Sequence, residues 1–274
     1  MDTLTKETAI ELFKSPDILS KFEAVRGKYG ANSYVQSALI VIADNPKLLE
    51  CTPKSLVKST LRSASLGLSL DPVARQAYLI PRSQKVKATK SAPEHYETVA
   101  CFQPHYHGLF DLAVRTNKYR TINVSPIHEG ERVYLDVSTG LHRFSSGNVL
   151  ATPNPDITGL HDGYREVTSG KPKSKIIGYL GYFKTNKGFE KTVWMTTEEI
   201  HEHAKTWAPD NYNSQYGAWK DEKKRPTMEM KTVFIALSKF MDLSGDEKLQ
   251  EAIRAELNTD DAIEAETEEI KEAK

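Results

Sequence analysis

One helix with no polar side constrains the fold of this chain more than any other feature. Residues 226–241 predict this helix, because Pro226 suits a first helical turn and no proline or glycine follows within the segment. Its apolar residues lie on nearly every side, which is typical of a helix buried between other layers. Lys231 and Lys239 interrupt the pattern. Because lysine rarely enters a protein interior unpaired, these two either reach solvent along their stems or line a concave surface that receives an anion.

The first part of the chain, residues 1–70, predicts a mainly helical lobe. Apolar residues recur at helical spacing in three segments before residue 46, and Gly27 and Gly30 interrupt the pattern. A fourth helix begins at Thr52-Pro53 and ends near Gly67. Its predicted buried stripe is Val57, Leu61, Ala64 and Leu68. A separate row on the same helix is cationic: Lys54, Lys58 and Arg62.

Strand patterns follow as far as residue 195. The predicted strands are 75–81, 95–103, 120–137 (split at Glu129-Gly130), 174–184 and 189–195, with a helix at 104–119. Residues 82–94 predict a loop between the first two strands. Residues 145–174, rich in Gly, Pro, Ser and Asn, predict a surface excursion. Hairpins joined to helices predict an α+β fold, a small antiparallel sheet with helices packed against it.

Charge is distributed unevenly along the last part of the chain. A capping box at Thr196–Glu199 predicts a helix to about residue 206, and an aromatic and charged loop then leads to the helix at 226–241. Residues 246–274 hold eleven acidic and four basic residues, a net −7, so residues 1–245 carry +7. We therefore predict a core at 1–245 and, at 246–274, an acidic C-terminal helix with a flexible tail. A basic body with an acidic tail is frequent among nucleic-acid-binding proteins.

Catalytic and cofactor signatures are missing from the sequence. It has neither a Gly-x-x-x-x-Gly-Lys-Ser/Thr loop nor a Gly-x-Gly-x-x-Gly turn. Two His-x-His pairs, His105/His107 and His201/His203, fall on predicted helices, where side chains two residues apart diverge and cannot share a metal ion. We therefore predict no cofactor, no metal and no catalytic residue. Cys51 and Cys101 are interpreted as core thiols. Without a signal peptide or membrane span, a cytoplasmic protein is expected.

Basic residues alternate with aromatic ones in three places. These are residues 82–90, residues 115–120, and the run from Trp207 to Arg225 that leads to Lys231 and Lys239. Single-strand binding uses this combination, since cations follow the phosphates while flat rings stack on bases of any kind. Each cluster alone is more typical of a solvated loop than of a binding site. Their occurrence together in a chain without a catalytic motif favours nucleic-acid binding.

Three blocks of the sequence resemble the RecT family of phage and prophage single-strand annealing proteins. They are "LRSASLGLSLDPVARQAYLIPR", "HYHGLFDLAVRTNKYRTINVSPIHEGERVYLD" and "WMTTEEIHEHAKTW…YGAWKDEKKRPTMEMKTVFIALSKF". They occur in the order and spacing of the family and extend from about Tyr34 to Met241. In place of the arginine pair that many members carry after Lys-Thr, this chain has Ile235-Ala236.

The resemblance implies an ATP-independent recombinase, without covalent catalysis, that anneals complementary single strands in phage-type homologous recombination. It also implies a ring or helical filament with DNA in a basic groove, a 5′→3′ exonuclease partner, contact with host single-strand-binding protein, and residence in the bacterial cytoplasm. From the resemblance and the clusters together we predict DNA binding by Arg82, Lys85, Lys87, Tyr106, Arg115, Lys118, Arg120, Trp219, Lys223, Lys224, Arg225, Lys231 and Lys239.

Two other interpretations remain open at the level of sequence. A metal-dependent nuclease or phosphoesterase would use the His-x-His pairs, and a passive coat protein would bind single strands without annealing them. DNA contact by the row Lys54, Lys58 and Arg62 is as compatible with the sequence as a solvated helix face.

Overall fold

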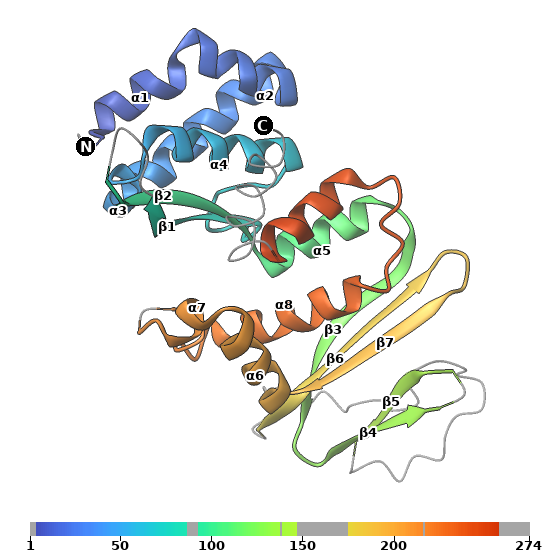
Figure 1. Cartoon of the computed structure of the whole chain (residues 1–274). Helices are drawn as coiled ribbons and strands as arrows, with labels where there is room; N and C mark the ends of the chain where they lie inside the picture. The colour runs from blue at the N-terminus through green and yellow to red at the C-terminus, as the bar shows by residue number, and fades with distance from the viewer. Residues whose placement is uncertain (1–3, 87–92, 138, 147–174, 216, 258–274) are drawn as a thin grey trace, which may run out of the picture. The chain divides into compact units, whose positions relative to one another are not determined.

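The structure is a computed structural model of the chain, and it describes residues 4–86, 93–137, 139–146, 175–215 and 217–257. The chain forms two compact units. Unit 1 comprises Met1–Leu112 and Ser244–Lys274, and unit 2 comprises Ala113–Leu243. Helices pack against small antiparallel sheets, which confirms the predicted α+β class (Figure 1).

The N-terminal helices of unit 1 are α1 (Lys6–Lys14), α2 (Pro16–Asp44), α3 (Pro46–Leu49) and α4 (Pro53–Leu66). The predicted interruption is confirmed at Gly27, whose φ of +69° kinks α2, whereas Gly30 stays helical. Gly67 ends α4 in the left-handed conformation, also as predicted. The helix α3 was not predicted, because a single turn carries no periodicity.

The buried side of α4 agrees with only half of the predicted stripe. Ala64 and Leu68 are buried as predicted, whereas Val57 and Leu61 are only half-buried. The buried residues are Leu56, Ser59, Thr60, Ser63, Ala64 and Leu66. Serines of α4 lie toward the strand that contains Ala100 because they hydrogen-bond to its backbone. Ser55 Oγ accepts the Ala100 N–H at 2.9 Å, and Ser59 Oγ donates to the Ala100 carbonyl at 2.6 Å. An apolar pattern cannot indicate a face whose role is hydrogen bonding.

That strand belongs to the antiparallel pair of β1 (Ala77–Val86) and β2 (His95–Pro104). The prediction that β1 ends at Pro81 and a loop starts at residue 82 was wrong. Pro81 pairs with Ala100, whose N–H and carbonyl point outward to α4. At such a non-hydrogen-bonded position the missing N–H of proline breaks no bond of the ladder, so the strand continues.

Residues 247–257 are helical and complete unit 1. Leu249 and Ala252 are fully buried, and Glu251 Oε1 lies 2.9 Å from Arg62 Nε of α4. One member of the predicted cationic row is thus in an ion pair, while Lys54 and Lys58 are exposed. The remaining acidic tail, residues 258–274, and most of the predicted surface excursion at 145–174 lie outside the described residues. The functional boundary at residue 245 stays a prediction.

Helix α5 (Tyr106–Arg115) leads into unit 2, which is built on a sheet of strand order β3-β6-β7. These strands are β3 (Tyr119–His128), β6 (Ile176–Thr185) and β7 (Glu190–Thr196), and β4 (Glu131–Asp136) pairs with β5 (Leu141–Ser146). The predicted turns are confirmed at Gly130 and Gly188, each with φ of +91°.

Helices α6 (Thr197–Trp207), α7 (Pro209–Asn213) and α8 (Arg225–Ser238) follow the sheet. Helix α8 crosses one face of it, as predicted for a helix that is apolar all round (Figure 1). Val233 and Leu237 are fully buried above Gly181, where an added Cβ would lie 3.1 Å from Val233 Cγ1. The predicted capping box is confirmed at α6, where Thr196 and Glu199 exchange hydrogen bonds. Among the described residues, no helix combines the length and apolar character needed to cross a bilayer.

Candidate nucleic-acid interface

The residues predicted to bind DNA divide between the two units, and each unit is considered separately. Lys87 lies outside the described residues. Unit 1 contains Arg82, Lys85 and Tyr106. Unit 2 contains Arg115, Lys118, Arg120, Trp219, Lys223, Lys224, Arg225, Lys231 and Lys239.

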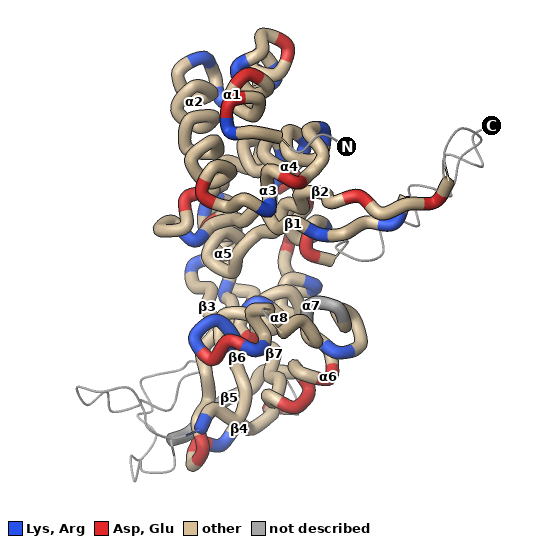
Figure 2. Tube along the Cα trace, turned by 90° about the vertical axis from the view of Figure 1, so that its left-hand side faces the viewer, with Lys and Arg blue, Asp and Glu red and all other residues tan. Residues whose placement is uncertain are grey.

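In unit 1 the β1–β2 hairpin presents a cation beside an aromatic ring. Lys85 and Tyr96 are paired across the strands and both are exposed. Lys85 Nζ lies 2.8 Å from Glu94 Oε1, so positive and negative positions neighbour each other here (Figure 2). An ion pair this open to solvent contributes little stability.

The start of α5 is a packed corner, and Tyr106 is buried within it. Gly108 permits the close approach of the helix to β1: a Cβ there would lie 2.1 Å from the Gln76 carbonyl oxygen. The prediction that His105 and His107 point apart was wrong. His105 precedes the helix, and the two rings stack with centroids 5.2 Å apart. Tyr106 therefore supports this corner.

In unit 2 three predicted cations lie at the end of α5, in the connection to β3 and at the start of β3. Arg115 and Arg120 are exposed. Lys118 Nζ donates to the Asp242 carbonyl at 3.1 Å and lies 3.5 Å from its carboxylate, while the Tyr119 hydroxyl donates to the same carbonyl at 3.3 Å. Lys118 thus fastens the beginning of β3 to the segment after α8.

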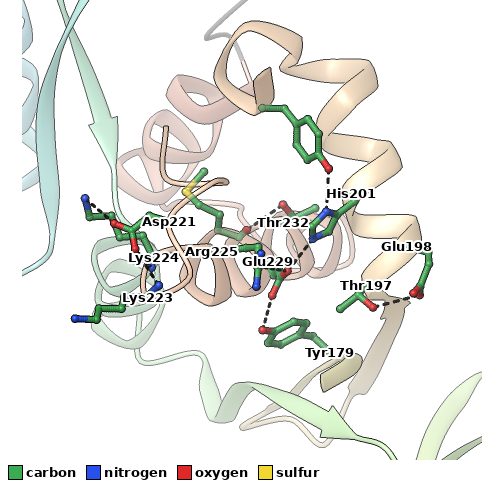
Figure 3. Close-up of polar contacts among 12 residues, drawn as sticks. Tyr179, Thr197, Glu198, His201, Asp221, Lys223, Lys224, Arg225, Glu229 and Thr232 are labelled. Atoms are coloured by element: carbon green, nitrogen blue, oxygen red, sulfur yellow. Dashed lines mark hydrogen bonds and ion pairs between the residues drawn. The ribbon is translucent and has the colours of Figure 1, made fainter. Parts of the chain in front are cut away.

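A buried carboxylate organises the amino-terminal half of α8. Glu229 is 4% exposed; it accepts a hydrogen bond from the Tyr179 hydroxyl at 2.7 Å and lies 2.9 Å from His201 Nε2 (Figure 3). Arg225, one turn earlier, has its Nε 3.8 Å from the same carboxylate. Burial, and then the hydrogen bond to Glu229, raise the pKa of Tyr179 above its ordinary value, so its hydroxyl stays a donor. Glu229 therefore ties β6, α6 and α8 together.

Two aromatic residues before α8, Tyr212 and Trp219, pack against this network. His201 Nδ1 lies 3.0 Å from the Tyr212 hydroxyl, and the Trp219 ring packs edge-on against His201 with centroids 5.6 Å apart. Trp219 is 5% exposed. Lys205 and Lys220 place their ammonium groups 5.8 and 5.0 Å from the centre of the Tyr212 ring. The rings thus anchor the segment and leave its cations at the surface.

Asp221 shapes the turn that presents Lys223 and Lys224. Its carboxylate accepts the backbone N–H groups of both residues, at 2.9 and 3.3 Å, and lies 3.2 Å from Lys224 Nζ (Figure 3). The Lys223 N–H bond, followed by the Lys224 side chain, holds the pKa of Asp221 below its ordinary value. With Lys223 and Lys224 exposed and Arg225 half-buried, this turn is a cationic surface on a fixed backbone.

The two lysines of α8 have different environments. Lys239 is exposed at the end of the helix, whereas Lys231 is 4% exposed within unit 2. From the sequence, the same two alternatives, solvent exposure or an anion-binding surface, were open for both lysines. Direct contact of Lys231, Trp219 or Tyr106 with DNA stays a prediction, and their burial suits residues that position the exposed cations.

Several residues of this surface were not found from the sequence. Glu229 and His201 organise it, and Lys205 and Lys220 extend it. Glu229 and His201 are 28 residues apart, and no local spacing signals such a pair. Within the described part of the chain, no three His, Cys, Asp or Glu side chains gather in a way that could hold a metal ion.

Known proteins are similar to this chain over most of its length. The chain is 28% identical over 253 residues to the uncharacterized protein YqaK of Bacillus subtilis (strain 168), covering 92% of this chain and 73% of that protein. The family model of the RecT family matches residues 32–273, which include both the hairpin of unit 1 and all of unit 2. The chain therefore belongs to the RecT family.

Proposed function

We propose that this protein binds single-stranded DNA through exposed lysines and arginines and anneals complementary strands in phage-type homologous recombination without ATP. Membership of the RecT family implies single-strand annealing in recombination, together with single-strand binding and oligomerisation, and no covalent catalysis. The family match over residues 32–273 is the observation that carries the proposal. The local structure supports it by exposing cations on ordered backbone.

The mechanism follows from the charge of the substrate. Two complementary strands repel each other through their phosphates, and each one folds on itself. Lys223 and Lys224, fixed by Asp221, neutralise phosphates of one strand, and Arg225 adds a further charge at the start of α8. Because the contacts are with the backbone, the bases remain free to pair and little sequence preference results.

Assembly multiplies this effect. In the proposal, copies of the chain form a ring or helical filament, so that one strand crosses the cationic surface of many subunits. A 5′→3′ exonuclease in the bacterial cytoplasm supplies the single strand, and host single-strand-binding protein hands it over. In this proposal, further contacts come from Arg82 and Lys85 of the hairpin, from Lys87, and from Arg115, Lys118 and Arg120.

An annealing assay tests the activity itself. Two complementary fluorescent oligonucleotides are mixed with the protein in the presence of a chelator and without nucleotide. We expect faster pairing than in buffer alone. Loss of activity on chelation, with shortening of the oligonucleotides when Mg²⁺ is restored, would support a nuclease instead. Binding that slows pairing would identify a passive coat protein, and a monomer that ignores oligonucleotides at low ionic strength would refute the proposal.

A charge-neutralising variant tests the cationic turn. In Lys223→Gln/Lys224→Gln, single-strand affinity should fall, and the slope of log K against log salt should become shallower by about 1.4, since each phosphate contact contributes about 0.7. The matched control, Lys14→Gln/Lys28→Gln, removes two exposed lysines of α1 and α2 that are outside the predicted interface. Equal slopes in both variants would remove the turn from the interface.

A further inference from the structure

Unit 2 exposes two large aromatic side chains, one at the end of α6 and one just after α8. Trp207, the last residue of α6, is 63% exposed, and Phe240, just after α8, is 49% exposed. Burying either ring against a flat partner would release apolar surface from water, so each is favourable for a stacking ligand.

Each ring has one neighbour that is cationic or titratable, and a further lysine lies beside Phe240 in the chain. The His203 ring lies 6.3 Å from the Trp207 ring, centroid to centroid. Lys191 Nζ of β7 lies 4.8 Å from the centre of the Phe240 ring. Lys239 directly precedes Phe240 in the chain and is exposed at the end of α8. We call Trp207, His203, Lys239, Phe240 and Lys191 the aromatic–cation strip.

The elements that carry the strip adjoin one another within unit 2. Helix α8 contacts both α6 and β7, and α6 contacts β7 (Figure 1). The strip therefore lies on parts of the fold that are held together by the core and by the Glu229 network, and not on a single loop.

Nearby carboxylates are engaged with other partners. Glu202 pairs with Lys205 at 2.5 Å, Asp242 with Lys118 at 3.5 Å, and Glu190 accepts the Tyr182 hydroxyl at 2.8 Å. The positive charges of Lys191 and Lys239 therefore act on an incoming anion without a competing carboxylate among these three.

We infer that the aromatic–cation strip is a base-stacking site for single-stranded DNA, with Trp207 and Phe240 against bases and Lys191 and Lys239 against the intervening phosphates. The inference rests on the proposed function and deepens it, because it assigns the base contacts that the cationic turn before α8 lacks. An aromatic side chain flanked by cations is suited to polynucleotides, whose bases and phosphates alternate. A purely apolar protein partner would leave both ammonium groups without a counter-charge.

Tryptophan fluorescence offers a direct test with the whole protein. Of the three tryptophans, Trp219 is buried and Trp194 is half-buried, so Trp207 is the one open to quenching by a stacked base. Oligothymidylate should quench the emission of the unaltered protein. Trp207→Phe should lose most of this quenching while its affinity, measured by anisotropy of a labelled oligonucleotide, changes less than threefold, because phenylalanine still stacks.

A truncating variant separates stacking from charge. Trp207→Ala should weaken oligothymidylate binding about tenfold, since stacking contributes about 1–3 kcal/mol per base, and should leave binding of an abasic deoxyribose-phosphate oligomer of the same length unchanged. The control Tyr134→Ala removes an exposed ring of β4 outside the strip and should bind both oligomers normally.

The outcomes distinguish this inference from the proposed function. Normal oligothymidylate binding by Trp207→Ala, or binding without quenching in the unaltered protein, would overturn the strip alone. A change in subunit assembly by light scattering, without a difference between the two oligomers, would instead make the strip a subunit contact. Failure of the unaltered protein to bind either oligomer would refute the proposed function as well.

Discussion

At the scale of single residues, buried polar groups hold the candidate site in unit 2 together. Glu229 accepts from a fully buried tyrosine and is held by a histidine from another helix. Such a carboxylate is stable only while its donors stay in place, because the loss of either partner leaves an uncompensated buried group. The site thus depends on a carboxylate that is itself almost fully buried.

We expect Glu229→Ala to destabilise the protein by about 3 kcal/mol, because the Tyr179 hydroxyl would lose its acceptor. For a unit of this size, the melting temperature should fall by roughly 6–12 °C. Calorimetry or circular dichroism measures the shift. Glu222→Ala, which removes an exposed carboxylate from the preceding loop, is the control and should melt normally. An unchanged midpoint in Glu229→Ala would show that the network contributes nothing to folding.

A second residue-scale prediction concerns pH. The Thr192 hydroxyl accepts the His142 backbone N–H at 2.6 Å and lies 3.0 Å from His142 Nδ1, so it can donate only to an unprotonated ring. Burial, and then Lys191, lower the pKa of His142. The unfolded chain therefore binds this proton more readily, and stability should be lost as the pH falls through about 6.5 toward the lower native pKa.

His142→Asn provides the comparison, because its carbonyl oxygen can accept from Thr192 but does not titrate. Chemical denaturation at about pH 7 and about pH 5 should show a smaller loss of unfolding free energy in His142→Asn than in the unaltered protein. Parallel losses would indicate that His142 is protonated equally in both states.

At the scale of elements, caps and turns were predicted well and packing faces poorly. The capping box at Thr196, the kink at Gly27 and the turns at Gly130 and Gly188 depend on a few neighbouring residues, so the sequence contains all the information that they need. The buried face of α4 and the length of β1 depend on each other. The N–H and carbonyl of Ala100 bond to Ser55 and Ser59 and not to β1. Because Pro81 is paired with Ala100, no ladder hydrogen bond needs an N–H from Pro81, and the strand can continue through it.

The same limit applies to the candidate site. The cations of the turn before α8 could be named from the sequence, because lysine and arginine are charged wherever they occur in a chain. The sequence did not separate Lys231 from Lys239, since a helix that is apolar all round gives no indication of which side meets solvent. The sequence also carried no indication that the Trp219 ring packs against His201 and Tyr212.

Packing between α5 and β1 gives an element-scale prediction. Gly108→Ala should destabilise the protein by about 2–3 kcal/mol, because the new Cβ would meet the Gln76 carbonyl at 2.1 Å. Gly30→Ala is the matched control: the position is helical, its nearest contact is an ordinary 3.4 Å, and the change should be neutral or stabilising by up to about 1 kcal/mol. Urea denaturation measures both. Equal midpoints would mean that α5 can shift without cost.

At the scale of the whole molecule, the acidic end of the chain has two parts. Residues 247–257 complete the core of unit 1, whereas residues 258–274 hold seven acidic and two basic residues, a net −5. Removing everything after residue 245 would therefore remove Leu249 and Ala252 from a buried position. A truncation after Leu257 takes away charge and leaves the described core intact.

We expect this shorter truncation to tighten single-strand binding at low salt, with the gain disappearing as salt screens the charge. Fluorescence anisotropy across a salt series measures it. A chain of full length, with the seven carboxylates after residue 257 changed to amides, should behave like the truncation. Unchanged affinity in both would argue that the acidic tail does not compete with DNA.

The hydrogen bonds from Lys118 and Tyr119 to the Asp242 carbonyl have a consequence for chain connectivity. Unit 2 is inserted into unit 1, so the polypeptide passes between the units twice, once before β3 and once after α8. These hydrogen bonds join the segment before β3 to the segment after α8. An excised 113–243 fragment would thus have adjacent ends, the geometry that tolerates circular permutation or transplantation into a host loop.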